Sequence, residues 1–211
     1  MGDVPPVILN VSHYGDATTD EMSLPKQLWL IQVLQDPSNW LATGKPDFIL
    51  FSGGGDDIAG DQFCIFLDYA GGPSGLDPSR IAAAIAMIRA SYMDLFSFRD
   101  RYAPGVPVFA HCYDFPIPDG RHPVCAGPWF KPSPDFCGYS VAQGTLIARA
   151  ALAQFRTMLL ELGSDPANRF VLVDTLGCLA ASDWANELHR YPAGFKAIAG
   201  RFLQALTGAL G

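Results

Sequence analysis

The sequence predicts a doubly wound α/β fold around a parallel sheet, and two observations support this. Four short runs are apolar on both faces, which is typical of buried strands in a parallel sheet rather than of alternating antiparallel strands. Segments with helical patterns lie between these runs, as they do wherever strands and helices alternate along a chain. The expected strands are Val7–Val11, Phe48–Ser52, Val106–Ala110 and Phe170–Asp174.

The helices are predicted from their start signals and their composition. Pro25 is suited to the first turn of a helix that includes Leu28–Leu34. Asp77 is suited to cap a long helix over Pro78–Tyr102. The other two expected helices are Val141–Leu162, which is rich in Ala and Leu, and the amphipathic segment Ala193–Leu210.

The 211 residues suit one domain, 1–211, in which two loop insertions interrupt the α/β pattern. The first insertion, at about 63–77, is rich in glycine. The second, at 114–139, holds six prolines and three glycines together with Trp129, Phe130 and Phe136. A loop of that length is usually functional or packed as a lid.

The chain is acidic, with a formal net charge of -7 and a pI of about 4.9. Nucleic acids and anionic membranes bind clustered Lys and Arg, so neither is expected as the main partner. The apolar runs are too short to cross a bilayer and are broken by Gly, Pro or charge, so no membrane span is expected. Met1–Pro6 has neither the basic start nor the apolar core of a signal peptide.

The cysteines predict a reduced, cytoplasmic protein. Their number is odd and they form no CxxC pair, which is typical of buried thiols. Two alternatives stay open: pairing of Cys125 with Cys137, and an export signal upstream of Met1 in a longer chain. The five are Cys64, Cys112, Cys125, Cys137 and Cys178.

In an open parallel sheet the active crevice lies beyond the carboxyl ends of the strands, so the residues that follow each strand are the candidates for function. The strongest group follows the last strand, where His189 stands before a helix with Asp183, Asn186 and Glu187 upstream. A histidine there is suited to act as a general base whose other nitrogen is held by a nearby acid. The alternative is a loop histidine that caps the helix.

A glycine-rich loop, Ser52–Asp57, follows the second expected strand. Its backbone N–H groups suit an oxyanion hole or a phosphate site, and the alternative is a tight strand-to-helix turn. Ser12 and Gly15 follow the first expected strand, where Gly15 can offer another N–H to the crevice. His111, Cys112, Asp114 and His122 match no zinc spacing, so neither a metal nor a cofactor is expected.

Together these strings resemble the SGNH (GDSL-type) hydrolase superfamily, most closely a bacterial branch with SGGGND and DWANELHPT motifs. Here they read SGGGDD at Ser52–Asp57 and DWANELHRY at Asp183–Tyr191, and His111–Arg121 is similar to the branch's loop after a strand. The resemblance covers nearly the whole chain. It implies a flavodoxin-like three-layer fold and Ser–His–Asp ester hydrolysis. It makes His189 the general base.

The same resemblance assigns the remaining roles and shows where this chain departs from the family. The GDS block with its serine is missing, so the family's first strand is expected to lie before Met1, and Ser12 and Ser52 are the replacement nucleophiles to consider. Asn186 stands where the acid is usual, so Asp183 is the expected substitute and Glu187 a poorer one. Arg190 stands where proline is typical. The oxyanion side consists of Gly15, Gly54, Gly55 and Asp56, the last in place of asparagine.

The expected function is hydrolysis of a small or medium acyl ester in a pocket lined by Tyr113, Phe115, Trp129 and Phe130. A non-catalytic relative that keeps the crevice for binding or assembly is the first alternative. A phosphate-binding protein that uses SGGGDD is the second, with Lys45 and Arg121 as its nearby cations. A missing central strand would expose apolar sheet edges, for which a homodimer, direct pairing of the flanking runs, and an exchanged segment are the expected remedies.

Overall fold

The computed structural model describes residues 7–40, 44–69, 75–122 and 127–210. Within them the chain is a mixed α/β unit with a parallel sheet of strand order β1-β2-β3, as the apolar runs predict. The register aligns Ile49 with Val108 and Val108 with Phe170, so the carboxyl ends of all the strands lie at one edge. The strands are β1 (Ile49–Phe51), β2 (Val108–His111) and β3 (Phe170–Val173).

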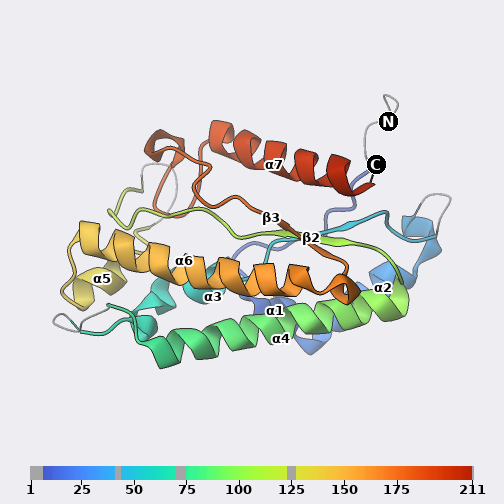
Figure 1. Ribbon diagram of the computed structural model, residues 1–211, viewed down its shortest axis with the longest axis horizontal. Coiled ribbons are helices and arrows are strands. Elements are labelled where there is room, and N and C mark those ends of the chain that lie inside the picture. Colours follow the sequence, from blue (N-terminus) through green and yellow to red (C-terminus); the bar gives the residue numbers. More distant parts are fainter. Residues whose placement is uncertain (1–6, 41–43, 70–74, 123–126, 211) are drawn as a thin grey trace.

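Helices lie on both sides of this sheet. α7 (Pro192–Leu210) lies on one side, and α4 (Pro78–Tyr102) and α6 (Val141–Ser164) lie on the other (Figure 1). The central strand β2 is buried along its whole length between these layers. The shorter helices are α1 (Thr18–Glu21), α2 (Leu24–Gln35), α3 (Gly55–Ile58) and α5 (Pro132–Phe136).

The two long helices α4 and α6 begin at residues whose side chains cap the first turn. Asp77 accepts hydrogen bonds from the N–H groups of Ser79 and Arg80, which confirms it as the cap of α4. Ser140 and Gln143 form a capping box at the start of α6. Pro25 lies in the first turn of α2, which begins earlier than the sequence predicts.

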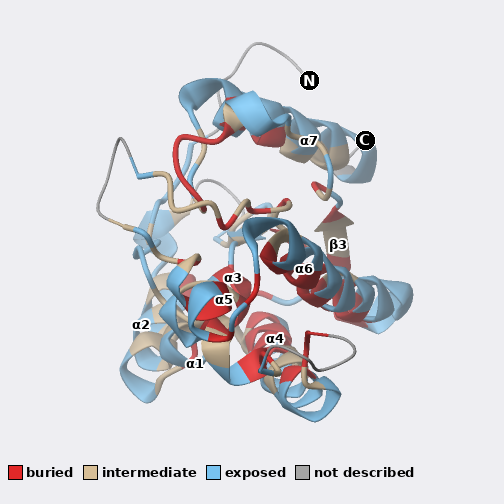
Figure 2. Cartoon of the chain, turned by 90° about the vertical axis from the view of Figure 1, so that its left-hand side faces the viewer, coloured by how far each residue is buried: buried red, intermediate tan, exposed pale blue. Residues whose placement is uncertain are grey.

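The main core lies between the sheet and the pair α4 and α6, where the buried residues face one another (Figure 2). Tyr92 and Phe155 are fully buried there. Arg99 is also fully buried, and it donates to the carbonyl oxygens of Val106 and Asn168. A buried guanidinium is stable only when its donors are satisfied, so Arg99 ties the last turn of α4 to the segments that lead into β2 and β3.

The expected strand Val7–Val11 does not form, and this corrects the prediction of four strands. The segment has no regular structure, and Val7, Ile8 and Leu9 are 78%, 69% and 44% exposed. A strand is stable only when a neighbour completes its hydrogen-bond ladder, and β1 pairs with β2 alone among the described residues. β1 is therefore an edge strand of the described sheet, and its Leu50 is 48% exposed.

One described helix, α4, is long and apolar enough to cross a membrane by length and composition alone. It packs against α1, α2 and α6 and carries part of the core on its inner face. These contacts are those of the core helix of an α/β unit.

Candidate active site

The loops that follow the strands meet at the carboxyl edge of the sheet, and the segment before α1 joins them there. Thr18 donates from its N–H to Asp57 Oδ2 at 2.8 Å and from its hydroxyl to Oδ1 at 2.7 Å. Thr18 is fully buried, so this contact fixes the segment that contains Gly15 beside the SGGGDD loop. Gly15 itself is exposed and has a left-handed backbone with φ of 75°.

The loop after β1 needs its glycines. Gly54 has φ of 105°, and a Cβ there would lie 2.5 Å from the ring of Phe155. A Cβ on Gly55 would lie 2.5 Å from the ring of Tyr113, so the tyrosine packs directly on the backbone of this loop. These glycines allow the loop to pack against α6 and against the residue Tyr113 that follows β2. This is the structural role expected of a tight strand-to-helix turn.

Ser52 and His111 come from neighbouring strand ends and are in hydrogen-bond contact. Ser52 Oγ lies 3.0 Å from His111 Nε2 and 3.3 Å from the hydroxyl of Tyr113. His111 Nδ1 accepts the backbone N–H of Tyr113 at 3.2 Å. Burial, with a smaller effect from the Arg190 charge, lowers the pKa of His111 to about 3. The imidazole is therefore neutral, and because Nδ1 accepts, the proton is on Nε2 and is donated to Ser52.

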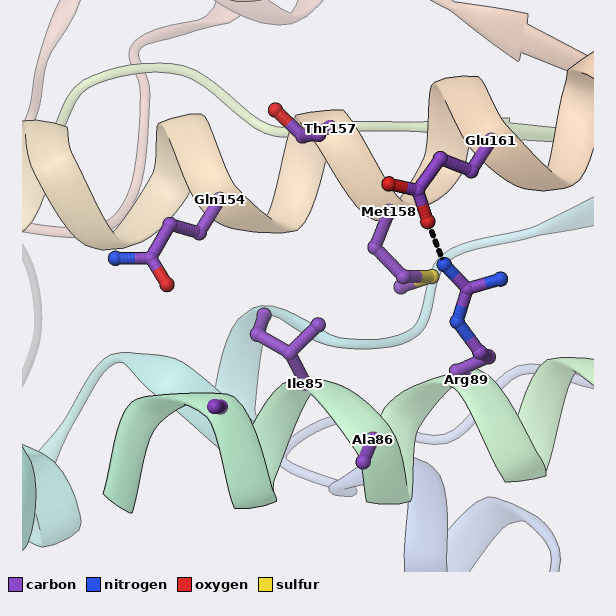
Figure 3. A pocket seen from close by; sticks show the side chains of 8 residues that line it. Ile85, Ala86, Arg89, Gln154, Thr157, Met158 and Glu161 are labelled. Atoms are coloured by element: carbon purple, nitrogen blue, oxygen red, sulfur yellow. Dashed lines mark hydrogen bonds and ion pairs between the residues drawn. The ribbon is translucent and has the colours of Figure 1, made fainter. Parts of the chain in front are cut away.

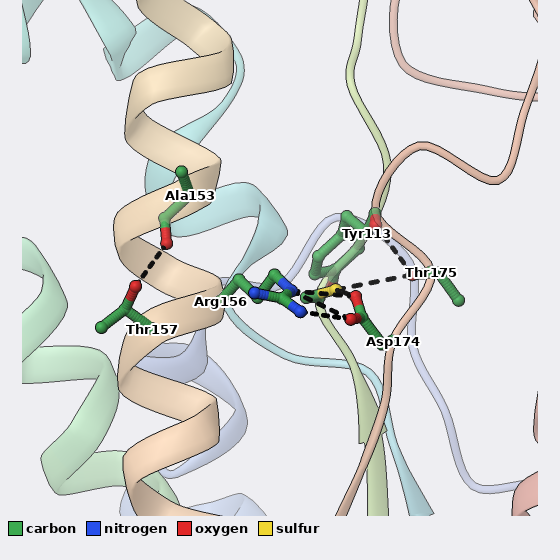
Figure 4. A network of polar contacts seen from close by, with 7 residues as sticks. Tyr113, Ala153, Arg156, Thr157, Asp174 and Thr175 are labelled. Carbon is green, nitrogen blue, oxygen red and sulfur yellow. Dashed lines mark hydrogen bonds and ion pairs between the residues drawn. The ribbon is translucent and has the colours of Figure 1, made fainter.

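Tyr113 has a strained backbone that its neighbours hold in place. Its φ is 61°, which a bulky residue rarely adopts. The hydroxyl of Thr175 donates to the Tyr113 carbonyl at 2.7 Å (Figure 4). Next to Thr175, Asp174 accepts from Arg156, and this ion pair lowers the pKa of Asp174 (Figure 4). Burial raises the pKa of the Tyr113 phenol to about 12, so it is a hydrogen-bond donor at neutral pH.

His189 is exposed, and its orienting partner in the structure is Asn186. Asn186 is buried, and its Oδ1 accepts the N–H groups of His189 at 2.7 Å and of Leu188 at 2.9 Å. Both Oδ1 and Nδ2 of this amide lie 3.1 Å from His189 Nδ1, so the amide meets the ring in either tautomer. Asp183 lies elsewhere, with its carboxylate on the N–H of Ala180 at 2.8 Å and no described hydrogen bond to His189. The structure thus places Asn186, and not Asp183, against the ring of His189.

Asp56 is the residue that connects His189 with the glycine loop. Burial raises the pKa of Asp56, Asp57 raises it further, and the charge of His189 lowers it. His189 therefore lies within electrostatic reach of the SGGGDD loop.

Glu187 is fully buried and is a structural anchor. Its carboxylate accepts backbone N–H groups at 2.7–3.0 Å from the insertion 114–139. It thereby fixes this insertion against the loop that carries His189. Sequence reasoning weighed Glu187 only as a poorer catalytic acid, and no local pattern identifies it as an anchor. Its partners are Gly120, Trp129, Phe130 and Lys131.

The remaining candidates lie apart from His189 or in the core. Ser12 is exposed and donates to Asn10 at 2.7 Å. Phe130 is buried against Phe63 with ring centroids 4.5 Å apart, so it is a core residue and does not line a pocket. Phe115 and Trp129 are partly buried on the insertion that Glu187 anchors. Cys125 lies outside the described residues, as does part of that insertion.

The cations that a phosphate site needs do not lie in the crevice. Lys45 donates to the carbonyl of Pro104 at 2.7 Å, next to the C-terminal end of α4. Arg121 pairs with Asp119, two residues before it. These two residues therefore do not supply the cation that a phosphate site at SGGGDD would need.

No family model matches this chain. No curated protein and no solved structure matches it either. In the part of the chain that the structure describes, His, Cys, Asp and Glu side chains do not gather into a group that could hold a metal.

A groove of about 390 Å³ lies between α4 and α6, away from these strand ends (Figure 3). Apolar side chains such as Ile85 and Met158 line it, and Arg89 pairs with Glu161 at its edge (Figure 3). It contains no nucleophile beside a base. The crevice at the strand ends is therefore the better candidate for chemistry.

Proposed function

We propose that this chain is an ester hydrolase of the SGNH type with a flavodoxin-like arrangement, acting on a small or medium acyl ester. The observation that supports this most is the placement of His189, whose ring contacts Asn186 and which acts electrostatically on Asp56 of the SGGGDD loop. In the tautomer that this scheme requires, Nδ1–H donates to Asn186 Oδ1 and Nε2 accepts a proton. His189 is exposed.

Water is the nucleophile in this proposal, because neither Ser12 nor Ser52 has a described hydrogen bond to His189. His189 Nε2 accepts a proton from the water as its oxygen attacks the ester carbonyl. The same proton then passes to the leaving alcohol as the tetrahedral intermediate collapses. Phe115, Trp129 and Tyr113 are the proposed walls of the acyl or alcohol pocket.

The rate enhancement in this scheme is modest. An SGNH enzyme without its serine has no covalent route, and hydrolases that lose a triad member keep about 10³- to 10⁴-fold over water. The carboxylate of Asp56 also opposes an oxyanion unless it is protonated. We therefore propose weak turnover of activated esters.

The experiment is turnover of 4-nitrophenyl acetate by the full chain and by His189→Ala. His122→Ala is the matched control, because His122 is also an exposed loop histidine but caps the carbonyl of Gly120. Loss of turnover in His189→Ala alone supports the proposal. Equal turnover in all three proteins contradicts it.

A specific observation favours the second candidate, a non-catalytic SGNH-type domain that binds a ligand or a partner. The tautomer of His111 makes Ser52 an acceptor, so the one Ser–His contact described here is not a nucleophile–base pair. The absence of any His189-dependent turnover in the same assay would favour this candidate.

A homodimer is part of the proposal, on the grounds that one edge of β1 has no strand partner among the described residues and that apolar residues of the chain are exposed. The outer edge of β1 and the exposed Val7–Val11 segment are both suited to strand pairing. Pairing of β1 edges, or of β1 with the partner's Val7–Val11, would bury these groups. The reduced thiols Cys64, Cys112, Cys137 and Cys178 support a cytoplasmic location within this proposal.

A further inference from the structure

Arg190 is a partly buried cation that has no acceptor among the described residues. Its Nε is buried and has no hydrogen-bond partner. Its guanidinium lies 4.9 Å from the ring of Trp184, which is buried and which pairs with Arg190 across a β-bridge. By contrast, Arg99 donates to four oxygens and Arg156 pairs with Asp174. A buried guanidinium without an acceptor is costly, so an anion beside it would be stabilised.

None of the described neighbours of Arg190 accepts a hydrogen bond from its guanidinium. Asp114 is the carboxylate that acts on Arg190, but its oxygens accept the backbone N–H groups of Phe115, Gly177 and Leu179. Tyr113 is a neutral phenol, and burial raises the pKa of the Cys178 thiol, so it too is neutral at pH 7. Asp114 therefore acts on Arg190 through its charge alone, and the guanidinium donors have no acceptor among the described residues.

The position of Arg190 relates it to the crevice. It follows His189 directly in the chain and acts electrostatically on His111 and Tyr113, the two residues that contact Ser52. Trp184 packs against the guanidinium, and the N–H donors of Arg190 have no hydrogen-bond acceptor among the described residues. A guanidinium edge carries two parallel donors, which match the two oxygens of a carboxylate.

We propose that Arg190 binds a carboxylate of the substrate, so that the ester cleaved at His189 has an acyl or alcohol part that ends in a carboxylate. This inference rests on the proposed hydrolase function for its substrate, but the anion site itself is independent of turnover. The long-range charge of the chain is screened beyond about 8 Å at physiological salt, so the local cation determines affinity.

The test is binding of succinate to the full chain, measured by calorimetry, with succinamide as a neutral probe of the same shape. We expect succinate but not succinamide to bind, and we expect R190Q to bind succinate about tenfold more weakly or worse, the loss of a charge-assisted pair. R149Q is the matched control, because Arg149 also stacks on an aromatic ring, that of Phe115, but is exposed. It should bind as the native chain does.

R190K keeps the charge and loses the paired donors, so its affinity for succinate should lie between that of the native chain and that of R190Q. R190K replaces R190Q if R190Q does not fold. Equal binding of succinate and succinamide, no binding of either, or unchanged binding in the Arg190 variant would overturn the proposal. H189A separates the two hypotheses: it should bind succinate normally. If H189A and the native chain bind succinate but hydrolyse neither 4-nitrophenyl acetate nor mono-4-nitrophenyl succinate, the hydrolase proposal fails and the anion site stands.

Discussion

His111 Nε2 lies 3.0 Å from Ser52 Oγ, and the hydrogen bond at the other ring nitrogen determines which of the two groups is the donor. Because His111 Nδ1 accepts the N–H of Tyr113, the imidazole donates to Ser52 and cannot take its proton. A Ser–His pair at a strand end is thus a structural pair in this chain. The base in the proposed scheme is His189.

We expect His111 to stay neutral, with its proton on Nε2, between pH 5 and pH 8, because burial lowers its pKa to about 3. Its folded pKa lies below the unfolded value of 6.5, so its contribution to stability is present above pH 6.5 and is lost as the pH falls toward 3. Imidazole ¹⁵N shifts recorded by NMR over this range check the prediction. A ring that titrates near pH 6.5 would contradict it.

Ser52→Ala should leave the hydrolysis of 4-nitrophenyl acetate within about threefold of the native kcat/KM, because Ser52 is not the nucleophile in the proposed scheme. Steady-state kinetics of the variant check this. Complete loss of turnover, with a burst of nitrophenol in the native chain, would show that Ser52 is acylated after all.

Glu21 should make the chain less stable as the pH rises. Burial raises its pKa to about 8, with further increases from Asp57, Asp56 and Asp20, and its Oε2 has no hydrogen-bond partner. The folded state therefore holds a proton that the unfolded state releases near pH 4.5, and stability falls between pH 4.5 and pH 8.

Glu21→Gln removes this dependence. The free energy of unfolding of Glu21→Gln relative to the native chain should rise by about 1 to 2 kcal/mol between pH 4.5 and pH 8, a value reduced for solvent screening. Urea unfolding at several pH values measures it. Asp94→Asn, an exposed change on α4, is the control. A difference between Glu21→Gln and the native chain that does not change with pH would count against the raised pKa.

Glu187→Gln should destabilise the chain by about 2 to 4 kcal/mol, because a charged acceptor of several buried N–H groups is lost. Glu161→Gln breaks an exposed pair with Arg89 and should cost less than about 1 kcal/mol. Chemical unfolding of both variants compares them. Equal small effects would mean that Glu187 does not anchor the insertion.

Leu50→Lys places a charge on the free edge of β1 and should shift the chain toward the monomer if that edge forms the dimer interface. Sedimentation at micromolar concentration measures the shift. Leu203→Lys, a change at an exposed position on α7, is the control. A native chain that sediments as a compact monomer would end the dimer proposal.

The sequence by itself determined the layers of this protein. Apolar runs predict β1, β2 and β3, and the caps and composition predict α2, α4, α6 and α7. Both kinds of signal are local in sequence. Each strand that formed also pairs with the strand before or after it in the chain. The grouping of polar residues at the strand ends is also a consequence of parallel pairing. It places Ser52, His111 and the His189 loop at one edge.

Only the tertiary structure decided which partner each polar group has. Val7–Val11 is as apolar as the other runs, yet it forms no strand, because pairing depends on an available edge and not on composition. Glu187 and Asn186 are both near His189 in sequence, but burial under the insertion makes one an anchor, and a contact at 3.1 Å makes the other the partner of the imidazole. Hydrogen bonds and desolvation act over a few ångströms. Residue type and spacing do not determine the distances between polar groups, which are set only when the chain packs.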